Sequence, residues 1–244
     1  MPFAGFLGLI VKLLLGLLPV LSAQAQGTFQ NFDFESANLS PTTPGQFPNF
    51  VPIGSALPGW TGYIGTVQLT QVEYNATTLG TASIDLLGPY WGAQNQSETR
   101  FGIIDGNYTV VLQSGEYTTS DGYNASIAQN GTIPGNAQSL QFEAAAQASA
   151  LSVSFAGNNL PLEALSTGQS PSGLFYTVYG VNIAPYANQK GQLEFTEVFN
   201  VHEPSVELDD ISFSTNSVVP EPIIVVLTAM GGLLFAARKW FARR

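Results

Sequence analysis

Short segments in which apolar and polar residues alternate are the feature that most constrains how this 244-residue chain folds. In "SLQFEA", Leu140 and Phe142 alternate with polar neighbours, and "ALSVSF" and "QLEF" show the same pattern. Successive side chains of a strand point to opposite faces of a sheet, so each segment has one face to bury and one to expose. This favours a two-layer antiparallel sandwich over a parallel α/β sheet. The segments with strand character are "GNYTVVLQSG", "SLQFEA", "ALSVSFAG", "GLFYTVYGVNI", "GQLEFTEVF" and "VELDDISFS".

Two segments do not fit the strand pattern. The run "EAAAQASA", Glu143 to Ala150, has helix propensity. We interpret it as the end of one strand and a turn, with a single helical turn as the alternative. Residues 38–60 hold five prolines within their first twenty-one residues, which predicts a long ordered loop. We therefore predict one domain over residues 27–214, followed by a polar linker at 215–219.

Charge is distributed unevenly along the chain. Over residues 27–219, sixteen Asp and Glu residues oppose only Arg100 and Lys190, a formal net charge of −14. Such a surface repels nucleic acid, so we expect no nucleic-acid partner. The chain has no cysteine, which excludes thiol catalysis, disulfides and cysteine-ligated metal clusters. Its single histidine, His202, lies in "FNVHEPS", and the chain has no nucleophile-elbow motif.

The N-terminus is typical of an export signal. Residues 3–22 are apolar apart from one lysine, and they lead into "AQA", the small-x-small pattern of a signal-peptidase site. We predict a signal peptide at residues 1–25, recognised through Ala23 and Ala25 and cleaved after Ala25. The alternative is an uncleaved membrane anchor, because the apolar stretch is long.

The C-terminus carries a short apolar segment that ends in a basic cluster. Ile223 to Ala237 has no charged residue, and as a helix it is about 22 Å long against a hydrocarbon core of about 30 Å. We predict a transmembrane helix at residues 223–237. The basic tail at 238–244 holds this end in the cytoplasm by the positive-inside rule, so the body lies outside. The membrane-stop residues are Arg238, Lys239, Arg243 and Arg244.

The order of Pro-Glu-Pro, apolar helix and basic end over residues 220–244 resembles the PEP-CTERM sorting signal of Gram-negative bacteria. The resemblance implies that an exosortase recognises Pro220, Glu221 and Pro222 and removes the helix. It also implies transient anchoring in the inner membrane, followed by release to the cell surface or extracellular matrix. Signal peptidase and exosortase are then the partners during export. The alternative is a plain C-terminal anchor whose prolines start the helix.

The body resembles the galactose-binding-like jelly roll found in many carbohydrate-binding modules. Three landmarks carry this resemblance: "NFDFES" at residues 31–36, "LPGW" at 57–60 and "VELDDISFS" at 206–214. The resemblance implies an all-β, antiparallel jelly-roll sandwich in which the first and last strands lie side by side.

The same resemblance implies a structural calcium where the chain ends meet. The residues at the matching positions are Glu35 and Asp209, with backbone carbonyls nearby. Two carboxylates suit a hard ion that takes six to eight oxygen ligands. Asp210 is the weaker ligand, because Asp209 shares its strand face with Ile211 and Phe213, which point inward. The alternative is that Glu35 and Asp209 are solvated acids at strand edges.

Three aromatic residues are candidates for stacking on a sugar ring. Trp60 follows a Pro-Gly turn, and we assign it to the core of the sandwich. Tyr90 and Trp91 lie in "LLGPYWGAQNQ", where glycine and proline predict a loop beside amide side chains. We therefore predict that Tyr90 and Trp91 form a solvent-facing carbohydrate platform.

These observations favour a non-catalytic, exported surface or matrix protein that associates with extracellular polysaccharide. A glycan-acting enzyme on the same sandwich is one alternative, because glycosidases need only two carboxylates and the chain is rich in them. A structural matrix component without specific sugar binding is the other.

Overall fold

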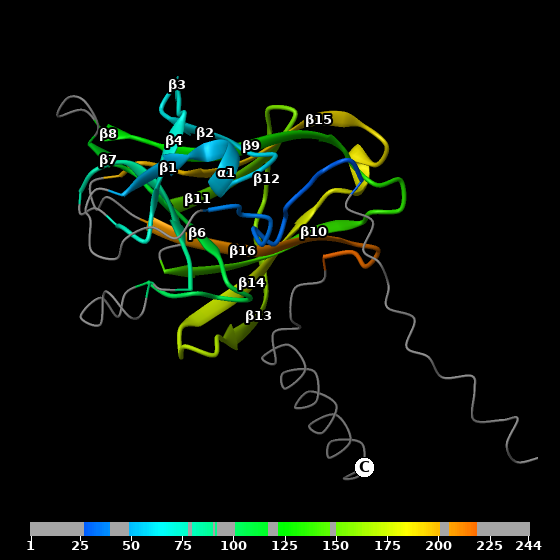
Figure 1. Ribbon diagram of the computed structural model, residues 1–244. Helices are drawn as coiled ribbons and strands as arrows, with labels where there is room; N and C mark the ends of the chain where they lie inside the picture. Colours follow the sequence, from blue (N-terminus) through cyan, green and yellow to red (C-terminus); the bar gives the residue numbers. More distant parts are fainter. Residues whose placement is uncertain are drawn as a thin grey trace, which may run out of the picture.

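The computed structural model describes residues 27–39, 49–77, 80–89, 91, 101–116, 122–146, 150–200 and 205–218. Over these residues the protein is a β-sandwich of two large sheets, with a small sheet of two strands beside them (Figure 1). The eight-stranded sheet has the order β1-β4-β5-β6-β16-β10-β14-β13. The six-stranded sheet has the order β12-β11-β15-β9-β2-β3. The β-sandwich predicted from the alternation is confirmed.

The elements have the following bounds. The eight-stranded sheet consists of β1 Phe50–Pro52, β4 Gln71–Tyr74, β5 Ser83–Leu87, β6 Thr109–Gln113, β10 Ser139–Ala146, β13 Glu163–Gln169, β14 Phe175–Asn182 and β16 Ser205–Ser214. The six-stranded sheet consists of β2 Thr61–Ile64, β3 Val67–Gln68, β9 Ala125–Thr132, β11 Leu151–Phe155, β12 Asn158–Leu160 and β15 Lys190–Glu197. The remaining elements are the pair β7 Gly115–Glu116 and β8 Gly122–Tyr123, the helix α1 Ile53–Ala56 and the 3-10 turn η2 Ala184–Tyr186.

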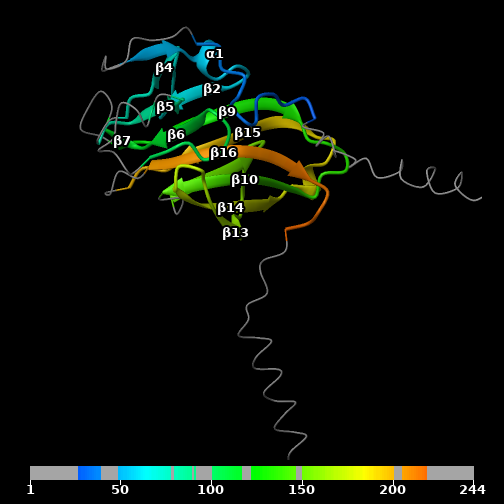
Figure 2. The ribbon, with the colours of Figure 1, turned by 60° about the horizontal axis from the view of Figure 1, so that its bottom comes forward.

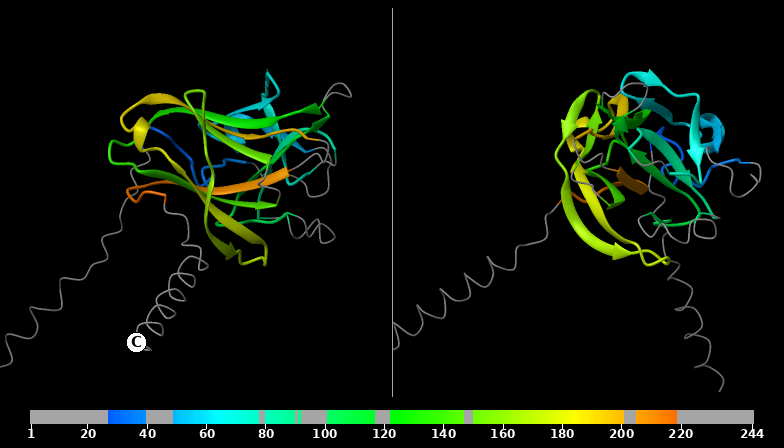
Figure 3. Two further views of the ribbon diagram at one scale, coloured as in Figure 1. Left: turned by 180° about the vertical axis from the view of Figure 1, so that it is seen from behind. Right: turned by 90° about the vertical axis from the view of Figure 1, so that its left-hand side faces the viewer.

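The core lies between the two large sheets and is rich in aromatic rings. Phe142 of β10 and Phe195 of β15 meet edge to face across the sandwich, with ring centroids 5.2 Å apart. Trp60 is buried in this core, as expected, and its Nε1 donates a hydrogen bond to the Asn31 carbonyl oxygen over 2.9 Å. Phe32 is buried against Trp60. Figure 3 shows the N-terminal segment that carries Phe32, in blue, running between the two sheets.

The predicted meeting of the two chain ends is present, but the first motif is not a strand. Residues 31–36 form a series of turns, and the Ile211 N–H of β16 donates to the Phe32 carbonyl oxygen over 3.0 Å. Asp210 has a φ of +41°, and the β10–β16 register shifts opposite it. Such a bulge reverses the alternation along a strand. Leu208 and Ile211 therefore both belong to the core, whereas Asp209 lies on the outer face. Our expectation that Asp209 shares a face with Ile211 is wrong for this reason.

The structure departs from these expectations in two further places, the loop at residues 38–60 and the direction of two strands. The predicted loop at residues 38–60 contains β1 and α1. Glu143 to Ala146 continue β10, as interpreted, whereas residues 147–149 lie outside the described part of the chain. The β4–β5 pair is parallel inside a sheet that we expected to be antiparallel. The β4–β5 pair lies toward the end of the sandwich that carries α1, and β13 and β14 form the opposite end (Figure 2).

Several predicted features lie outside the described residues. These are the signal peptide, the Pro-Glu-Pro motif, the apolar segment at 223–237 and the basic tail. Among the helices that the structure does describe, none has the length and apolar character needed to cross a membrane.

Candidate functional site

A cleft of about 360 Å³ lies at the end of the sandwich that carries the parallel strands. The β4–β5 ladder consists of two residue pairs, Glu73–Asp85 and Tyr74–Leu86. The residues that precede these pairs in β4 and β5 are not paired with each other, and the cleft lies between them. On its other side the cleft is bounded by β3 and by the residues that connect β3 to β4. The cleft is thus a product of how two parallel strands begin.

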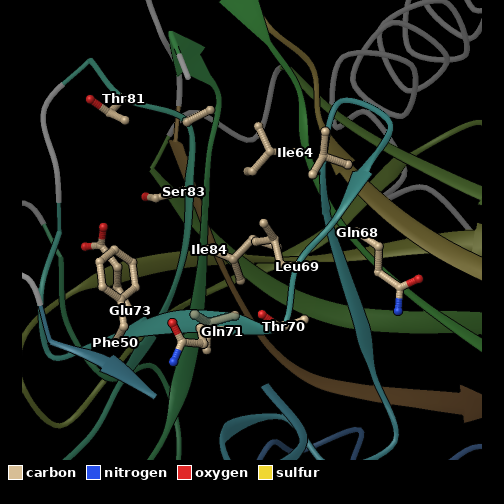
Figure 4. Close-up of a pocket in the computed structure, with 13 residues that line it drawn as sticks. Phe50, Ile64, Gln68, Leu69, Thr70, Gln71, Glu73, Thr81, Ser83 and Ile84 are labelled. Carbon is tan, nitrogen blue, oxygen red and sulfur yellow. The ribbon is translucent and has the colours of Figure 1, made fainter. Parts of the chain in front are cut away.

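The cleft has an apolar centre and a polar margin. Ile64, Leu69 and Ile84 lie together in its middle (Figure 4). Among the described residues that line it, none is basic. The polar lining residues are Gln68, Thr70, Gln71, Glu73, Thr81 and Ser83. An apolar centre surrounded by a few polar groups is typical of sites for small molecules.

Phe50 offers an exposed aromatic ring at one flank of the cleft. Its side chain is 52% exposed, which is unusual for a phenylalanine in a β-strand. Phe50 is the register partner of Glu73 in the antiparallel β1–β4 pair, so both side chains lie on the same face. Figure 4 shows the two side chains next to each other. A ligand in the cleft can therefore contact a ring face and a carboxyl group together.

Glu73 and Asp85 form a buried pair of carboxyl groups beside the cleft. Glu73 lines the cleft with only 5% of its side chain exposed, and Asp85 lies behind it with none exposed. The two side chains are hydrogen-bonded to each other, and the Ser83 hydroxyl donates to Asp85 Oδ2 over 2.7 Å. Within the described part of the chain, Glu73 Oε2 and Asp85 Oδ1 accept no hydrogen bond.

The electrostatics of this pair follow from its burial. Burial raises the pKa of Asp85 well above its ordinary value, and the neighbouring Glu73 charge raises it further. Burial also raises the pKa of Glu73. Two carboxyl groups in hydrogen-bond contact share one proton most favourably, because two adjacent negative charges repel each other.

The predicted calcium ligands, Glu35 and Asp209, both contact the segment that precedes β6. Glu35 Oε1 accepts hydrogen bonds from the backbone N–H groups of Asn107 and Tyr108, over 2.6 and 2.9 Å. Asp209 Oδ2 accepts one from the Thr109 hydroxyl over 2.6 Å and one from the Asp105 N–H over 3.2 Å. The structure therefore brings the two carboxylates to one loop, which the sequence analysis did not anticipate.

The partners of these two carboxylates are hydrogen-bond donors. The Asn107 side-chain amide donates to the second oxygen of Glu35, and the Asp210 N–H donates to Asp209 Oδ1. Burial raises the pKa of Asp209 to about 8, although the hydrogen bonds from Thr109 and from the backbone lower it. An N–H group that points at a carboxylate occupies the position that a cation would take. The two carboxylates therefore fit the role of holding the loop in place better than that of calcium ligands. Calcium at Glu35 and Asp209 stays a prediction.

The predicted aromatic platform takes a different form. Trp91 is only 3% exposed, and its Nε1 donates to the Phe101 carbonyl oxygen over 3.0 Å. It packs with Phe101, Leu87 and Val111 on the outer face of the eight-stranded sheet. The expectation of a solvent-facing Trp91 is wrong, because this second apolar cluster covers the ring. Tyr90 lies outside the described residues.

Sequence reasoning missed the residues that form the cleft. Phe50 and Glu73 lie in segments too short or too irregular to show a strand period. Their partner Asp85 sits in "SIDLL", where one acid among apolar residues was a usable signal of a buried carboxyl group. The pairing of Glu73 with Asp85 depends on a parallel contact that no local pattern reveals.

No family model matches this sequence, and no curated protein matches it. Among solved structures, it is similar to TmCBM61 in complex with β-1,4-galactotriose, with 11% identity, a TM-score of 0.39 and coverage of 77% of this chain and 97% of that one. It is similar to the K1 cleaved adhesin domain of Lys-gingipain from Porphyromonas gingivalis W83, with 13% identity, a TM-score of 0.34 and coverage of 73% and 100%. It is also similar to the Stig cyclase Fisc from Fischerella sp. TAU, with 14% identity, a TM-score of 0.38 and coverage of 77% and 95%. The sequence identities and TM-scores are low, so the ligands and activities of these proteins are not assigned to this chain.

Proposed function

We propose that this protein is a non-catalytic, exported module that binds saccharide units of an extracellular polysaccharide in the cleft beside β4 and β5. The observation that carries the proposal is the composition of the cleft. It combines an exposed Phe50 ring and an apolar centre with amide, hydroxyl and carboxyl groups. A sugar ring has an apolar face and a rim of hydroxyl groups, and so it matches both kinds of surface.

Charge narrows the class of saccharide. None of the described cleft residues is basic, and residues 27–219 carry a formal net charge of −14. Uronic acids and sulfated or phosphorylated sugars would meet a repulsive field here. Neutral or basic sugars are therefore the favoured ligands.

The carboxyl pair supports a binding role over a hydrolytic one. Glycosidases hold their two carboxyl groups about 5 to 9.5 Å apart, so that a glycosidic bond and a nucleophile fit between them. Glu73 and Asp85 are in hydrogen-bond contact, and Asp85 does not reach the cleft. A glycan-acting enzyme at this pair would need a separation that the described site does not have.

The export route of the proposal rests on the two ends of the sequence. The signal-peptidase pattern at Ala23 and Ala25 supports entry into the export pathway. The Pro-Glu-Pro motif, the apolar segment and the basic tail support recognition by an exosortase while the body lies outside the inner membrane. The mature protein would then reach the cell surface or the extracellular matrix.

Isothermal titration of the mature protein with a panel of neutral and basic oligosaccharides tests the binding role. We expect Phe50→Ala to weaken binding by about fivefold, since stacking on an aromatic ring contributes on the order of 1 kcal/mol. The matched control is Phe175→Ala, because Phe175 of β14 is 74% exposed at the opposite end of the eight-stranded sheet. Equal losses in both variants, or product formation from any oligosaccharide, would contradict the proposal.

A further inference from the structure

We infer that the carboxyl group of Glu73 forms a subsite for the ammonium group of an amino sugar, such as a glucosamine unit. The inference deepens the proposed saccharide-binding function and rests on it. It assigns a chemical class to the ligand and a role to a pair of buried acids that sugar binding in general does not require.

The carboxyl pair has hydrogen-bond acceptors that the described residues leave unsatisfied. Buried polar atoms in folded proteins nearly always have hydrogen-bond partners, and a lone buried acceptor destabilises the fold. Glu73 Oε2 and Asp85 Oδ1 are both buried, and neither has a partner among the described residues. Glu73 is 95% buried and lines the cleft, and its carboxyl group lies beside the exposed Phe50 ring (Figure 4), so a ligand in the cleft lies next to this residue.

An ammonium group is the hydrogen-bond donor that best satisfies a buried carboxyl acceptor of this kind. An ammonium group offers three N–H donors together with a positive charge, and charge-assisted hydrogen bonds are about twice as strong as neutral ones. A neutral hydroxyl offers one donor and leaves the negative charge of the pair uncompensated. An N-acetyl group offers one N–H donor and adds bulk without charge. The free amine of a deacetylated sugar therefore suits Glu73 best.

The groups that line the cleft suit an ammonium group better than a metal ion. Calcium takes six to eight oxygen ligands. Only Glu73 of the pair lines the cleft, and the described residues contain no group of three or more acidic, histidine or cysteine side chains that could hold a metal. The surrounding amides, hydroxyls and exposed Phe50 ring match the rest of a sugar, whereas a metal ion would use few of them.

The position of the pair also fits a ligand that spans the cleft. Phe50 and Glu73 are register partners and lie next to each other at one flank (Figure 4). A sugar whose apolar face lies on Phe50 can direct a ring substituent toward Glu73. Asp85 acts as a positioning residue, because it is hydrogen-bonded to Glu73 and does not touch the ligand.

The test uses the mature protein at physiological salt and three trisaccharide probes: β-1,4-linked glucosamine, its fully N-acetylated form and neutral β-1,4-linked glucose. Trilysine, a cation without a sugar ring, controls for general attraction to an acidic protein. We expect the glucosamine trimer to bind about tenfold or more tighter than the N-acetylated and neutral trimers, and trilysine not to compete. Glu73→Gln should remove that difference, because glutamine keeps the shape of the side chain and lacks its negative charge.

The control variant is Glu163→Gln, because Glu163 is an exposed acid of β13 at the far end of the same sheet. It should keep the preference for the amine. Asp85→Asn supplies a second variant, which should reduce the preference only in part. Equal binding of amine and N-acetyl trimers that still depends on Phe50 would overturn the subsite and leave the proposed function intact. Binding of no trimer would overturn both, and a requirement for calcium would replace the ammonium group with a metal ion.

Discussion

Two pairs of acidic residues differ in whether the fold supplies hydrogen-bond donors to their carboxyl groups. Glu35 and Asp209 accept hydrogen bonds from the backbone and side chains of residues 105–109, and Asp209 accepts one more from the Asp210 N–H. Glu73 and Asp85 are hydrogen-bonded to each other, and each keeps one buried oxygen without a partner among the described residues. The first pair holds a loop in place, whereas Glu73 of the second pair lines a cleft.

The difference lies in what surrounds each pair. A carboxylate that accepts several N–H bonds is part of the architecture, because the loop depends on it for its own hydrogen bonds. A carboxyl group that is buried without donors destabilises the fold, and such exceptions concentrate at functional sites. Removal of a carboxylate should therefore have opposite effects on stability in the two regions.

The largest expected effect is that of Asp209→Ala. This change leaves the Thr109 hydroxyl and the N–H groups of Asp105 and Asp210 without their acceptor. Each buried unsatisfied donor costs about 1 to 3 kcal/mol, so we expect a loss of about 3 kcal/mol in the free energy of unfolding. For a domain of this size, Tm should fall by roughly 6–12 °C. Scanning calorimetry measures it, and a loss below about 1 kcal/mol would show that the loop does not depend on Asp209.

A second effect concerns pH. It tests another buried acid whose carboxyl oxygens have no hydrogen-bond partner among the described residues, at a position away from the cleft. Glu197 of β15 is fully buried, and within the described residues neither of its carboxyl oxygens has a partner. Burial raises its pKa from 4.5 to about 8. The folded protein therefore holds a proton that the unfolded chain releases, and the stability from this proton is complete below about pH 4.5 and is lost as pH rises through about 8.

Glu197→Gln should remove this pH dependence. Between pH 5 and pH 9 the wild-type protein should lose on the order of 2 kcal/mol more than the variant, because the variant cannot ionise at this position. Urea unfolding at a series of pH values measures the difference. Asp209 also has a raised pKa and contributes a slope of the same sign, so the variant should keep part of the pH dependence. Parallel curves for the two proteins would mean that Glu197 has a donor in solution.

A smaller effect of opposite sign is expected at the cleft. Glu73→Gln removes one charge from a buried pair of acids and keeps the shape of the side chain, so the free energy of unfolding should rise by about 1 kcal/mol at pH 7. Thermal unfolding checks this, with Glu163→Gln as an exposed control that should change little. A loss of stability as large as that of Asp209→Ala would remove the distinction between the two pairs.

The smallest expected effect is that of calcium at Glu35 and Asp209. A cation there must displace N–H donors, so we expect weak binding, with about 0.4 kcal/mol of stabilisation when free calcium equals Kd. This corresponds to a rise in Tm of roughly 1 °C. Thermal unfolding in EDTA and in millimolar calcium measures it. Asp209→Asn should lose the response and Asp210→Asn should keep it, whereas identical wild-type curves would exclude the calcium site.

Local sequence patterns predicted the sandwich and failed where strands deviate from regular geometry. Alternation placed Phe142 and Phe195 in the core because a regular strand keeps its period. The same rule placed Asp209 on the wrong face, because the bulge at Asp210 adds one residue to the count. The burial of Trp91 depends on Phe101 and Val111, which come from later parts of the chain.

The candidate site was less accessible to sequence reasoning than the fold. Its polar groups come from β3, the connection after β3, β4, β5 and the residue Thr81 just before β5, which meet only in three dimensions. A family resemblance drew attention to Glu35 and Asp209, yet neither the loop before β6 that Glu35 contacts nor the donors that occupy its oxygens were anticipated. Hydrogen-bond partners of a carboxylate depend on the path of the facing backbone, and no single-sequence pattern encodes that path.

The central place of β16 has a mechanical consequence. The strand lies between β6 and β10. Just after it, the Ser139 hydroxyl donates a hydrogen bond to the Asn216 carbonyl oxygen. A pull on the C-terminal side of the domain therefore reaches two hydrogen-bonded ladders at once, where an edge strand would offer one. The Ile211 N–H bond to Phe32 passes part of the load to the N-terminal segment inside the core. We therefore expect a domain tethered through β16 to resist extraction by force better than one tethered through β13, which is hydrogen-bonded to β14 alone.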